Sequence, residues 1–167
     1  MRQKKNEEEF NEIIKYSEKS ENLGITLEEF ILMFLGYSPR NKVEGKTRFQ
    51  KLIYLLNKHH NIFPNLKYTR YYYGPYSNEL EEAINNLKRI GYINEKIIYF
   101  GPSFYYYQIN RNLTESGYKK FKDLESRYVK VAEKIKKMIK STLSSKNYFD
   151  MELSELLKIV YKEAGYI

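Results

Sequence analysis

Apolar residues recur every three or four positions through most of the chain, which is the spacing that places them on one side of an α-helix. This pattern predicts helices over residues 6–19, 26–35, 46–59, 77–90 and 114–143, and a last helix that begins at Asp150. Stretches rich in tyrosine, phenylalanine and isoleucine predict strands over residues 68–73, 96–100 and 104–109. The expected fold is therefore mainly α with a small antiparallel β wing, an α+β class.

Capping and turn residues mark the ends of several of these segments. Thr26 and Glu29 have the spacing of a capping box, in which each side chain bonds to the backbone N–H of the other residue. Ser77 is a suitable N-cap, and Gly91 is a natural residue to end the helix that Ser77 begins. The Gly-Pro-Ser turn at 101–103 joins the last two strands into a candidate wing.

The order helix, strand, helix and then two strands is that of a winged helix-turn-helix. We divide the chain into an N-terminal helix (1–25), a winged-helix core (26–112) and a C-terminal segment (113–167) that holds a long helix and a terminal helix. The C-terminal helices are expected to pack on the core or to dimerise. Because 167 residues are enough to bury a core, we expect one compact domain.

An aromatic stretch before the helix over 77–90 contains a turn motif. Glycine can take a positive φ and proline fixes its own φ, so together they can swing a strand sharply into a helix. The motif is either pure architecture, or its tyrosines and the preceding Tyr71 and Tyr73 form an exposed binding patch. The residues of the turn motif are Gly74, Pro75, Tyr76 and Ser77.

Three strings of the sequence carry a resemblance to known proteins: KTRFQKLIYLL at 46–56, YGPYS at 73–77 and LKRIGYI at 87–93. They resemble the YwgA-like family of poorly characterised bacterial and archaeal proteins and, more distantly, the Panacea or SocA-like antitoxin domains. Those proteins share a Lys-x-x-Lys-Leu helix and a Tyr-Gly-Pro turn before a helix. The resemblance covers about residues 26–117. It implies a winged-helix core with a role in transcriptional regulation or protein neutralisation, and it implies no catalytic residues.

The formal net charge of +8 favours a polyanionic partner, and double-stranded DNA is the first candidate. In a helix-turn-helix the second helix enters the major groove, which here is the helix over 77–90. The helix over 46–59 is expected to turn its basic side chains to solvent. The candidate DNA contacts are basic and amide side chains on or near these helices and the wing: Arg40, Lys42, Lys46, Arg48, Lys51, Asn78, Asn85, Lys88, Arg89 and Lys96.

Acidic residues at the start of the helix over 77–90 count against DNA reading. Glu79, Glu81 and Glu82 lie where phosphates would repel them. The helix dipole favours acidic residues in a first turn and basic residues in a last turn, so the same pattern can simply stabilise the helix. Both interpretations stay open at this point.

The largest basic excess lies in residues 113–145, where nine Lys and Arg against four Asp and Glu give +5. These side chains form either a solvated helix face or a surface that follows a nucleic-acid backbone. The basic residues of the predicted long helix are Lys119, Lys120, Lys122, Arg127, Lys130, Lys134, Lys136, Lys137 and Lys140.

The same predicted helix carries a narrow apolar seam with alternating three- and four-residue spacing. The seam either packs on its own domain or pairs with a second copy, and a two-fold dimer would space two DNA-reading helices for a palindromic site. The candidate seam residues are Phe121, Leu124, Tyr128, Val131, Ile135 and Met138.

Nothing in the sequence points to catalysis. There is no cysteine, so disulfides and thiolate metal sites are excluded. His59 and His60 are adjacent and lie about 100° apart on a helix, so they cannot easily share a metal. Phosphate-binding glycine loops, nucleophile elbows and zinc-binding helix motifs are absent from the sequence. We therefore expect no enzymatic activity, no cofactor and no metal.

The charged start of the chain, residues 1–12, lacks the apolar segment of a signal peptide, and no apolar run approaches the roughly 18 residues of a membrane span. A cytoplasmic protein without a membrane partner is expected. The function expected first is a winged-helix DNA-binding transcriptional regulator. The alternative is a winged-helix protein–protein interaction module, an antitoxin-like neutraliser or an assembly subunit, that does not bind DNA.

Overall fold

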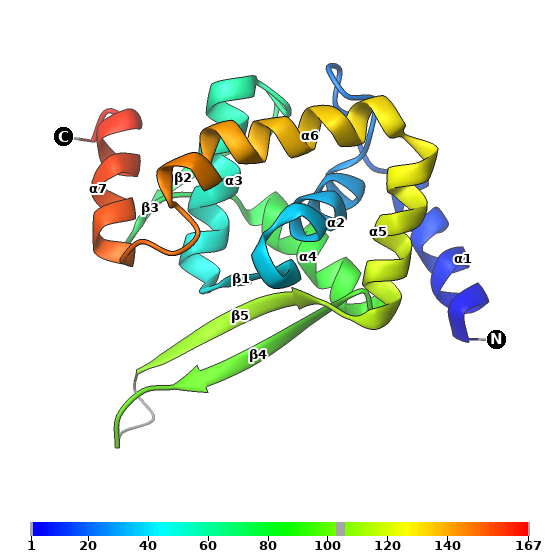
Figure 1. Cartoon of the computed structure of the whole chain (residues 1–167), viewed down its shortest axis with the longest axis horizontal. Helices are drawn as coiled ribbons and strands as arrows, with labels where there is room; N and C mark the ends of the chain where they lie inside the picture. Colours follow the sequence, from blue (N-terminus) through cyan, green and yellow to red (C-terminus); the bar gives the residue numbers. More distant parts are fainter. Residues whose placement is uncertain (1, 103–105, 167) are drawn as a thin grey trace.

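The computed structural model describes residues 2–102 and 106–166, and this part of the chain is mainly helical (Figure 1). Its α-helices are α1 (Arg2–Lys15), α2 (Leu27–Tyr37), α3 (Lys46–His60), α4 (Asn78–Ile90), α5 (Glu115–Arg127), α6 (Val129–Thr142) and α7 (Leu153–Glu163). Its strands are β1 (Lys42–Glu44), β2 (Thr69–Tyr71), β3 (Gly74–Tyr76), β4 (Ile93–Tyr99) and β5 (Tyr107–Leu113). The predicted class, mainly α with a small antiparallel β part, is confirmed.

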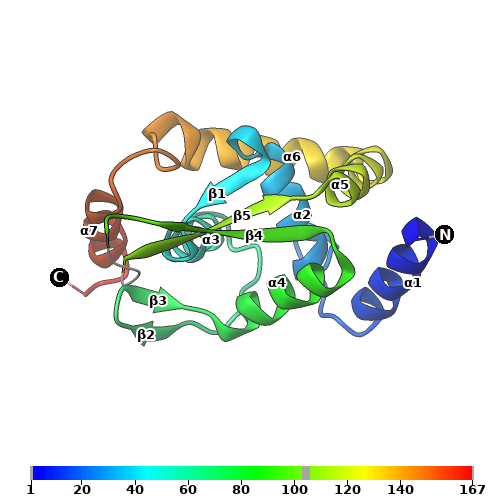
Figure 2. The same ribbon diagram turned by 90° about the horizontal axis from the view of Figure 1, so that it is seen from below.

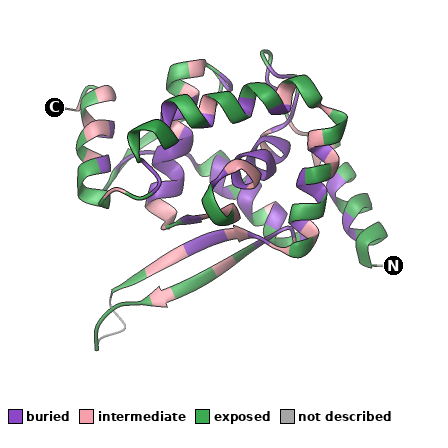
Figure 3. Cartoon of the chain, viewed as in Figure 1, coloured by how far each residue is buried: buried purple, intermediate pink, exposed green. Residues whose placement is uncertain are grey.

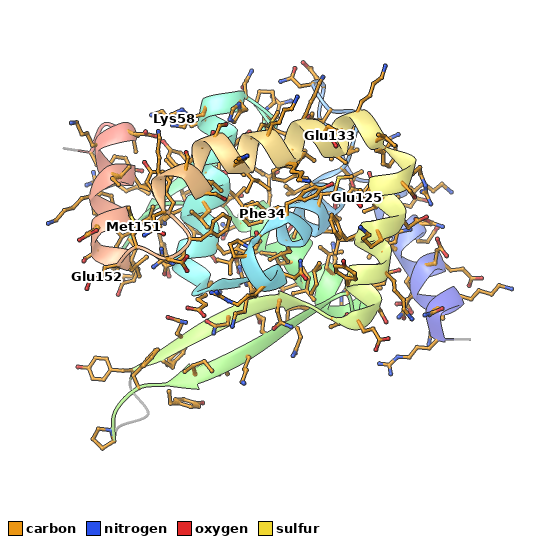
Figure 4. All side chains as sticks on the ribbon, viewed as in Figure 1. Phe34, Lys58, Glu125, Glu133, Met151 and Glu152 are labelled. Atoms are coloured by element: carbon orange, nitrogen blue, oxygen red, sulfur yellow. The ribbon has the colours of Figure 1, made fainter. Side chains whose placement is uncertain are left out.

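Helix α2 lies at the centre of the hydrophobic core. Phe34 on α2 packs edge-on against Phe49 of α3, with 5.5 Å between the ring centroids, and stacks on Phe149 at 6.1 Å (Figure 4). Figure 3 shows the buried residues gathered on α2, on α3 and on the inward sides of the helices around them. The apolar character of α2 on most of its sides therefore reflects a helix that is enclosed by others.

The caps predicted at Thr26, Ser77 and Gly91 are confirmed. Thr26 donates its backbone N–H to the Glu29 carboxylate over 2.9 Å, and the Glu29 N–H returns a bond to the Thr26 hydroxyl over 3.2 Å, which completes the capping box. The Ser77 hydroxyl accepts the N–H of Leu80 at the start of α4, and Gly91 ends α4 with a φ of 92°.

A three-stranded antiparallel sheet, in the order β1-β5-β4, lies against the helices. Val43 of β1 pairs with Arg111, and Ile97 of β4 pairs with Ile109. The β4–β5 hairpin projects from the helical body (Figures 1 and 2). A hairpin was predicted at this place, although Ser103 of the predicted turn and the first two residues of the strand predicted at 104–109 lie outside the described residues. Strand β1 was not predicted, because three residues are too few to show a period.

The aromatic stretch before α4 is a second hairpin, not a single strand that turns into a helix. Strands β2 and β3 pair antiparallel, with Arg70 opposite Pro75. The chain reverses at Tyr72 and Tyr73, and Gly74, with a φ of 97°, begins the returning strand. The predicted position of the turn is therefore wrong. Pro75 is tolerated in β3 because a two-stranded ribbon leaves one edge of each strand without a ladder partner.

The single long helix predicted over 114–143 is broken at Tyr128, which has a φ of −118° and a ψ of 60°. Helix α5 ends before this residue and α6 begins after it, and both helices pack on α2. A straight helix of that length would run past the core. The break lets Leu124 on α5 and Ile135 on α6 both reach the interior, where neither is exposed.

The residues of the predicted seam pack against other parts of the same chain. Its residues either belong to the core or pack against it, with Tyr128, Val131 and Met138 half-buried. Of the two interpretations, this packing accounts for the seam without a second copy, and no apolar seam is left exposed on α5 or α6 for a coiled-coil dimer.

The start of the last helix was predicted wrongly. Glu152, not Asp150, occupies the N-cap position of α7, and its side chain makes no capping bond. Asp150 is exposed, and its carboxylate lies 3.8 Å from a guanidinium nitrogen of Arg40.

The contact of Gly36 on α2 with Phe121 on α5 yields a test of this packing. A Cβ added at Gly36 would overlap the ring of Phe121. We expect Gly36→Ala to lower the free energy of unfolding by about 2 kcal/mol, since overpacking strains a close-packed contact; urea denaturation measures this. In a Phe121→Leu background the same substitution should cost less, because the smaller side chain leaves room. Equal costs in the two backgrounds would contradict the close approach.

Candidate functional site

Two side chains of α3 hold the segment that links the β2–β3 hairpin to α4. Lys51 donates its ammonium to the carbonyl of Pro75 over 2.7 Å. Gln50 donates to the Ser77 carbonyl over 3.0 Å, and its own amide oxygen accepts the Ser77 N–H over 2.9 Å. We call Gln50 and Lys51 the clamp. It joins two of the three strings that carry the family resemblance, so a structural role accounts for both.

The clamp is buried, and this corrects the expectation that Lys51 faces solvent. Only 1% of Lys51 is exposed, and Gln50 is fully covered. Burial disfavours the charged ammonium and lowers the pKa of Lys51 to about 8. A buried lysine that is bound to a backbone carbonyl cannot serve as a phosphate contact.

Arg48 is also turned inward, against prediction. Its guanidinium donates to the carbonyl of Tyr148 over 2.8 Å and to the carbonyl of Met151 over 2.5 Å. Figure 4 labels Met151 just before α7. Arg48 therefore ties α3 to the segment that leads into α7, and it is not available to bind DNA.

Glu81, one of the three acids that argued against DNA reading, belongs to a buried ionic network. Arg111 of β5 binds both of its carboxylate oxygens, at 3.0 and 2.5 Å, and also donates to Glu95 over 2.9 Å. Gln50 adds a bond to Glu81 over 2.8 Å, and Lys46 lies 3.3 Å from the same carboxylate. Burial opposes ionisation of Glu81, but the bonds and charge of Arg111 outweigh it and hold the pKa below its usual value.

The other predicted DNA contacts are dispersed over several elements. Four of the basic residues have protein partners: Arg40 with Glu44 and Asp150, Lys42 with Glu44, Lys88 with Glu95, and Arg89 with Asn86. Asn78, Asn85 and Lys96 are exposed. The structure does not bring the predicted residues together as one basic surface, because Arg48 and Lys51, which would have formed its centre, are inside.

What the two hairpins share instead is exposed aromatic side chains. Tyr72, one of the two residues between the strands of the first hairpin, is 85% exposed, and Tyr106 beside the tip of the second is 71% exposed. We call this set the aromatic hairpin surface: Tyr71, Tyr72, Tyr73, Tyr99, Phe100, Tyr106 and Tyr107. Of this set the sequence singled out only Tyr71 and Tyr73, because a pattern of aromatic residues does not reveal which of them are exposed. Tyr76, also singled out, is half-buried and packs on Tyr71.

A groove of about 520 Å³ connects the two hairpins. Tyr73 of the first hairpin, Phe100 and Tyr107 of the second, and Leu153 at the start of α7 all line it, and Lys46 borders it at the beginning of α3. Three residues of the aromatic hairpin surface, Tyr73, Phe100 and Tyr107, therefore line one concave region that both hairpins share.

The histidines take part in local contacts. His59 lies 3.0 Å from Glu163, and His60 lies 2.7 Å from the Thr142 hydroxyl. Among the described residues, no three His, Asp or Glu side chains come together as a metal site would require. Within the same residues, no helix has both the length and the apolar character needed to cross a membrane.

Comparison with known proteins relates part of the chain to an uncharacterised bacterial protein. No family model matches the chain. The chain is similar to the Uncharacterized protein YwgA of Bacillus subtilis (strain 168), with 33% identity over 91 residues. The match covers 54% of this chain and 52% of YwgA, so the chain spans about half the length of that relative.

The buried ion pair generates the first test of the site. We expect Glu81→Gln to lower the free energy of unfolding by about 3 kcal/mol, because it leaves the Arg111 guanidinium buried with half of its partners. Glu82→Gln is the matched control: this neighbour is exposed, and its loss should change stability by less than about 0.5 kcal/mol. Chemical denaturation of both variants measures the difference, and equal losses would show that the network adds no stability.

Lys51 generates a second test, in which pH is the variable. Its folded-state pKa of about 8 lies below the ordinary value of 10.5, so between these values the unfolded chain binds more protons and stability rises with pH. Relative to Lys51→Met, the wild type should gain about 3 kcal/mol of unfolding free energy across that window. Urea denaturation of both proteins from pH 7.5 to 10.5 measures the gain. A constant difference would mean that the ammonium is not desolvated.

Proposed function

We propose that this chain is a winged-helix module that binds another protein through its aromatic hairpin surface. The element order α2, β1, α3, α4, β4, β5, with β1 beside β5 in the sheet, supports the winged-helix part of the proposal. In this arrangement α3 and α4 are the helix-turn-helix, the β2–β3 hairpin is an insertion between them, and the β4–β5 hairpin is the wing.

The observation that carries the proposal is the number of large aromatic side chains left in solvent on two neighbouring hairpins. Tyrosine is enriched at protein interfaces, because its ring buries a large apolar area while its hydroxyl keeps a hydrogen bond. Contiguous exposed apolar surface on a folded domain commonly marks an interaction site. The groove beside Tyr73 and Tyr107 gives a partner side chain a concave place to bind.

The clamp contributes to binding indirectly. It fixes the base of the β2–β3 hairpin through Pro75 and Ser77, so the tyrosines of that hairpin start from an ordered backbone. Binding by a preorganised surface loses less conformational entropy than binding by a loop that must first be ordered.

Reading of DNA by α4 has weaker support. Arg48 and Lys51 are inside, Lys88 is paired with Glu95 at 2.5 Å, and Glu79 and Glu82 remain exposed on the helix that would enter the major groove. The resemblance to antitoxin domains and to the YwgA-like family agrees with a protein-binding role, an antitoxin-like neutraliser or an assembly subunit, without identifying the partner.

Site-specific photocrosslinking in the source organism tests the proposal. A photoreactive phenylalanine at Tyr72 and another at Tyr107 should each capture the same protein, because both positions face one partner. The same probe at Tyr16 is the matched control, since this tyrosine is 80% exposed near the end of α1, away from the hairpins. Capture at Tyr16 alone, or of unrelated proteins at the two hairpins, would contradict a shared interface.

The captured partner then permits a quantitative test. Replacing Tyr73 and Tyr107 by serine should weaken its binding to the purified chain at least tenfold, since aromatic anchors dominate interface energetics. Tyr16→Ser should leave the affinity unchanged. Calorimetry of the purified pair measures both effects.

A further inference from the structure

We propose that the exposed face of α6 binds the phosphodiester backbone of a nucleic-acid duplex. This inference is independent of the protein-binding function, because it concerns a different surface. We call the surface the lysine ridge, and it consists of Lys130, Lys134, Lys136, Lys137 and Lys140, all of them exposed.

The break at Tyr128 divides the basic residues of the C-terminal region into two classes. Those on α5 have acidic partners: Lys119 with Glu115, Lys120 with Glu7 and Asp123, Lys122 with Glu125, and Arg127 with Asp123. Within the described chain, no ion pair is recorded for any lysine of the ridge. The five lysines share α6 with a single acid, Glu133, which Figure 4 labels near the start of the helix. Lys136 is close enough to Glu125 of α5 for its charge to help lower the pKa of that carboxyl. The positive charge of α5 is thus largely neutralised by ion pairs, and that of α6 is neutralised to a smaller extent.

The stability of α6 itself explains only part of the ridge, because Lys137 follows Glu133 at the favourable four-residue spacing but other lysines do not have such a partner. Lys130 and Lys134 are four residues apart, as are Lys136 and Lys140, and like charges at this spacing destabilise a helix. Lys130 also lies in the first turn, where the helix dipole disfavours a cation. The last turn of α6 holds Lys140, which suits the dipole as the basic last turn of α4 does. The first turns differ, because that of α4 is acidic and that of α6 holds no acid. A bound polyanion would relieve the repulsion among these lysines.

The ridge is held in place by the core. Ala132, Ile135 and Ile139 on the inner face of α6 are buried, and the helix packs on α2 and α3. The lysines are therefore presented by a fixed backbone over roughly 15 Å, from the rise of an α-helix between Lys130 and Lys140. Helix α6 crosses the opposite side of the body from the projecting β4–β5 hairpin (Figure 1). A duplex on the ridge would leave the aromatic hairpin surface free.

The chemistry of the ridge favours a phosphate backbone. Lysine ammoniums act as point charges toward phosphates, and such contacts position a duplex without reading its sequence. The remaining exposed residues of α6, Val129, Glu133 and Ser141, do not form a base-reading set. A membrane surface is disfavoured, because an interfacial helix inserts its apolar face into the bilayer and that face of α6 is already in the core.

Fluorescence anisotropy across a salt series tests the proposal, with a short mixed-sequence DNA duplex and an RNA duplex of the same sequence as probes. We expect duplex binding whose log K falls with log salt by about 0.9 per phosphate contacted. Replacing Lys134 and Lys137 by glutamate should lower the affinity at low salt at least tenfold and reduce that slope by about 2. Circular dichroism checks that this double variant and the control variant described next are folded.

The matched control replaces Lys4 and Lys5, exposed near the start of α1, by glutamate, which changes the net charge equally. This control should keep the wild-type affinity and slope, and so should the Tyr73 and Tyr107 double variant. Binding of either duplex supports the proposal. Binding of only one of them shows whether the ridge prefers DNA or RNA. Absence of duplex binding, or an equal loss of affinity in the control, would overturn the proposal.

Discussion

The buried ion pair between Glu81 and Arg111 is the contact on which the arrangement of this chain depends. It connects α4 to the central strand of the sheet, and Gln50 connects the same carboxylate to α3. Arg111 also lies over the ring of Phe49, 5.1 Å from its centroid, so its charge is enclosed by the core on another side. A desolvated charge tolerates little displacement of its partners. Helix α4, helix α3 and the sheet are therefore held in one relative position.

Because α3, α4 and the sheet are held together in this way, three polar residues of α3, Arg48, Gln50 and Lys51, are buried and bind other segments of the chain. The clamp fixes the first hairpin, and Arg48 fixes the segment before α7. Five of the basic side chains that remain accessible lie together on α6, while the accessible aromatic side chains are concentrated on the hairpins. The molecule thus separates an aromatic surface from a cationic one, and the two surfaces suit partners of different chemistry.

The sequence predicted well the features that depend on local interactions. The capping box at Thr26, the N-cap at Ser77 and the ending at Gly91 were readable because each involves residues close together in the chain. The β4–β5 hairpin was readable for the same reason. Features that depend on distant partners were not: the break at Tyr128 carries no glycine or proline, and the need for it arises from the position of α2.

Charged residues were the least predictable part of the candidate site. Periodicity assigns Arg48, Lys51 and Glu81 to solvent, because a charge is usually exposed. Their partners, such as Arg111 for Glu81 and the Tyr148 carbonyl for Arg48, lie 30 and 100 residues away in the sequence. No local pattern reveals that such a partner exists. The exposure of the hairpin tyrosines could not be predicted either, because the neighbouring sequence does not show whether another part of the chain covers them.

The Arg48 contact has a consequence for the order in which the chain assembles. Closing a loop of that length carries a large entropic cost, which only a preformed surface can offset. Helices α2 and α3 can form much of their packing with segments nearby in the sequence. The segment before α7, in contrast, binds Arg48 at the start of α3, which is far away in the sequence. Docking of α7 is thus expected to be a late event in folding. Until it occurs, one wall of the aromatic groove, Leu153, is missing, so the groove is a product of the final stage of assembly.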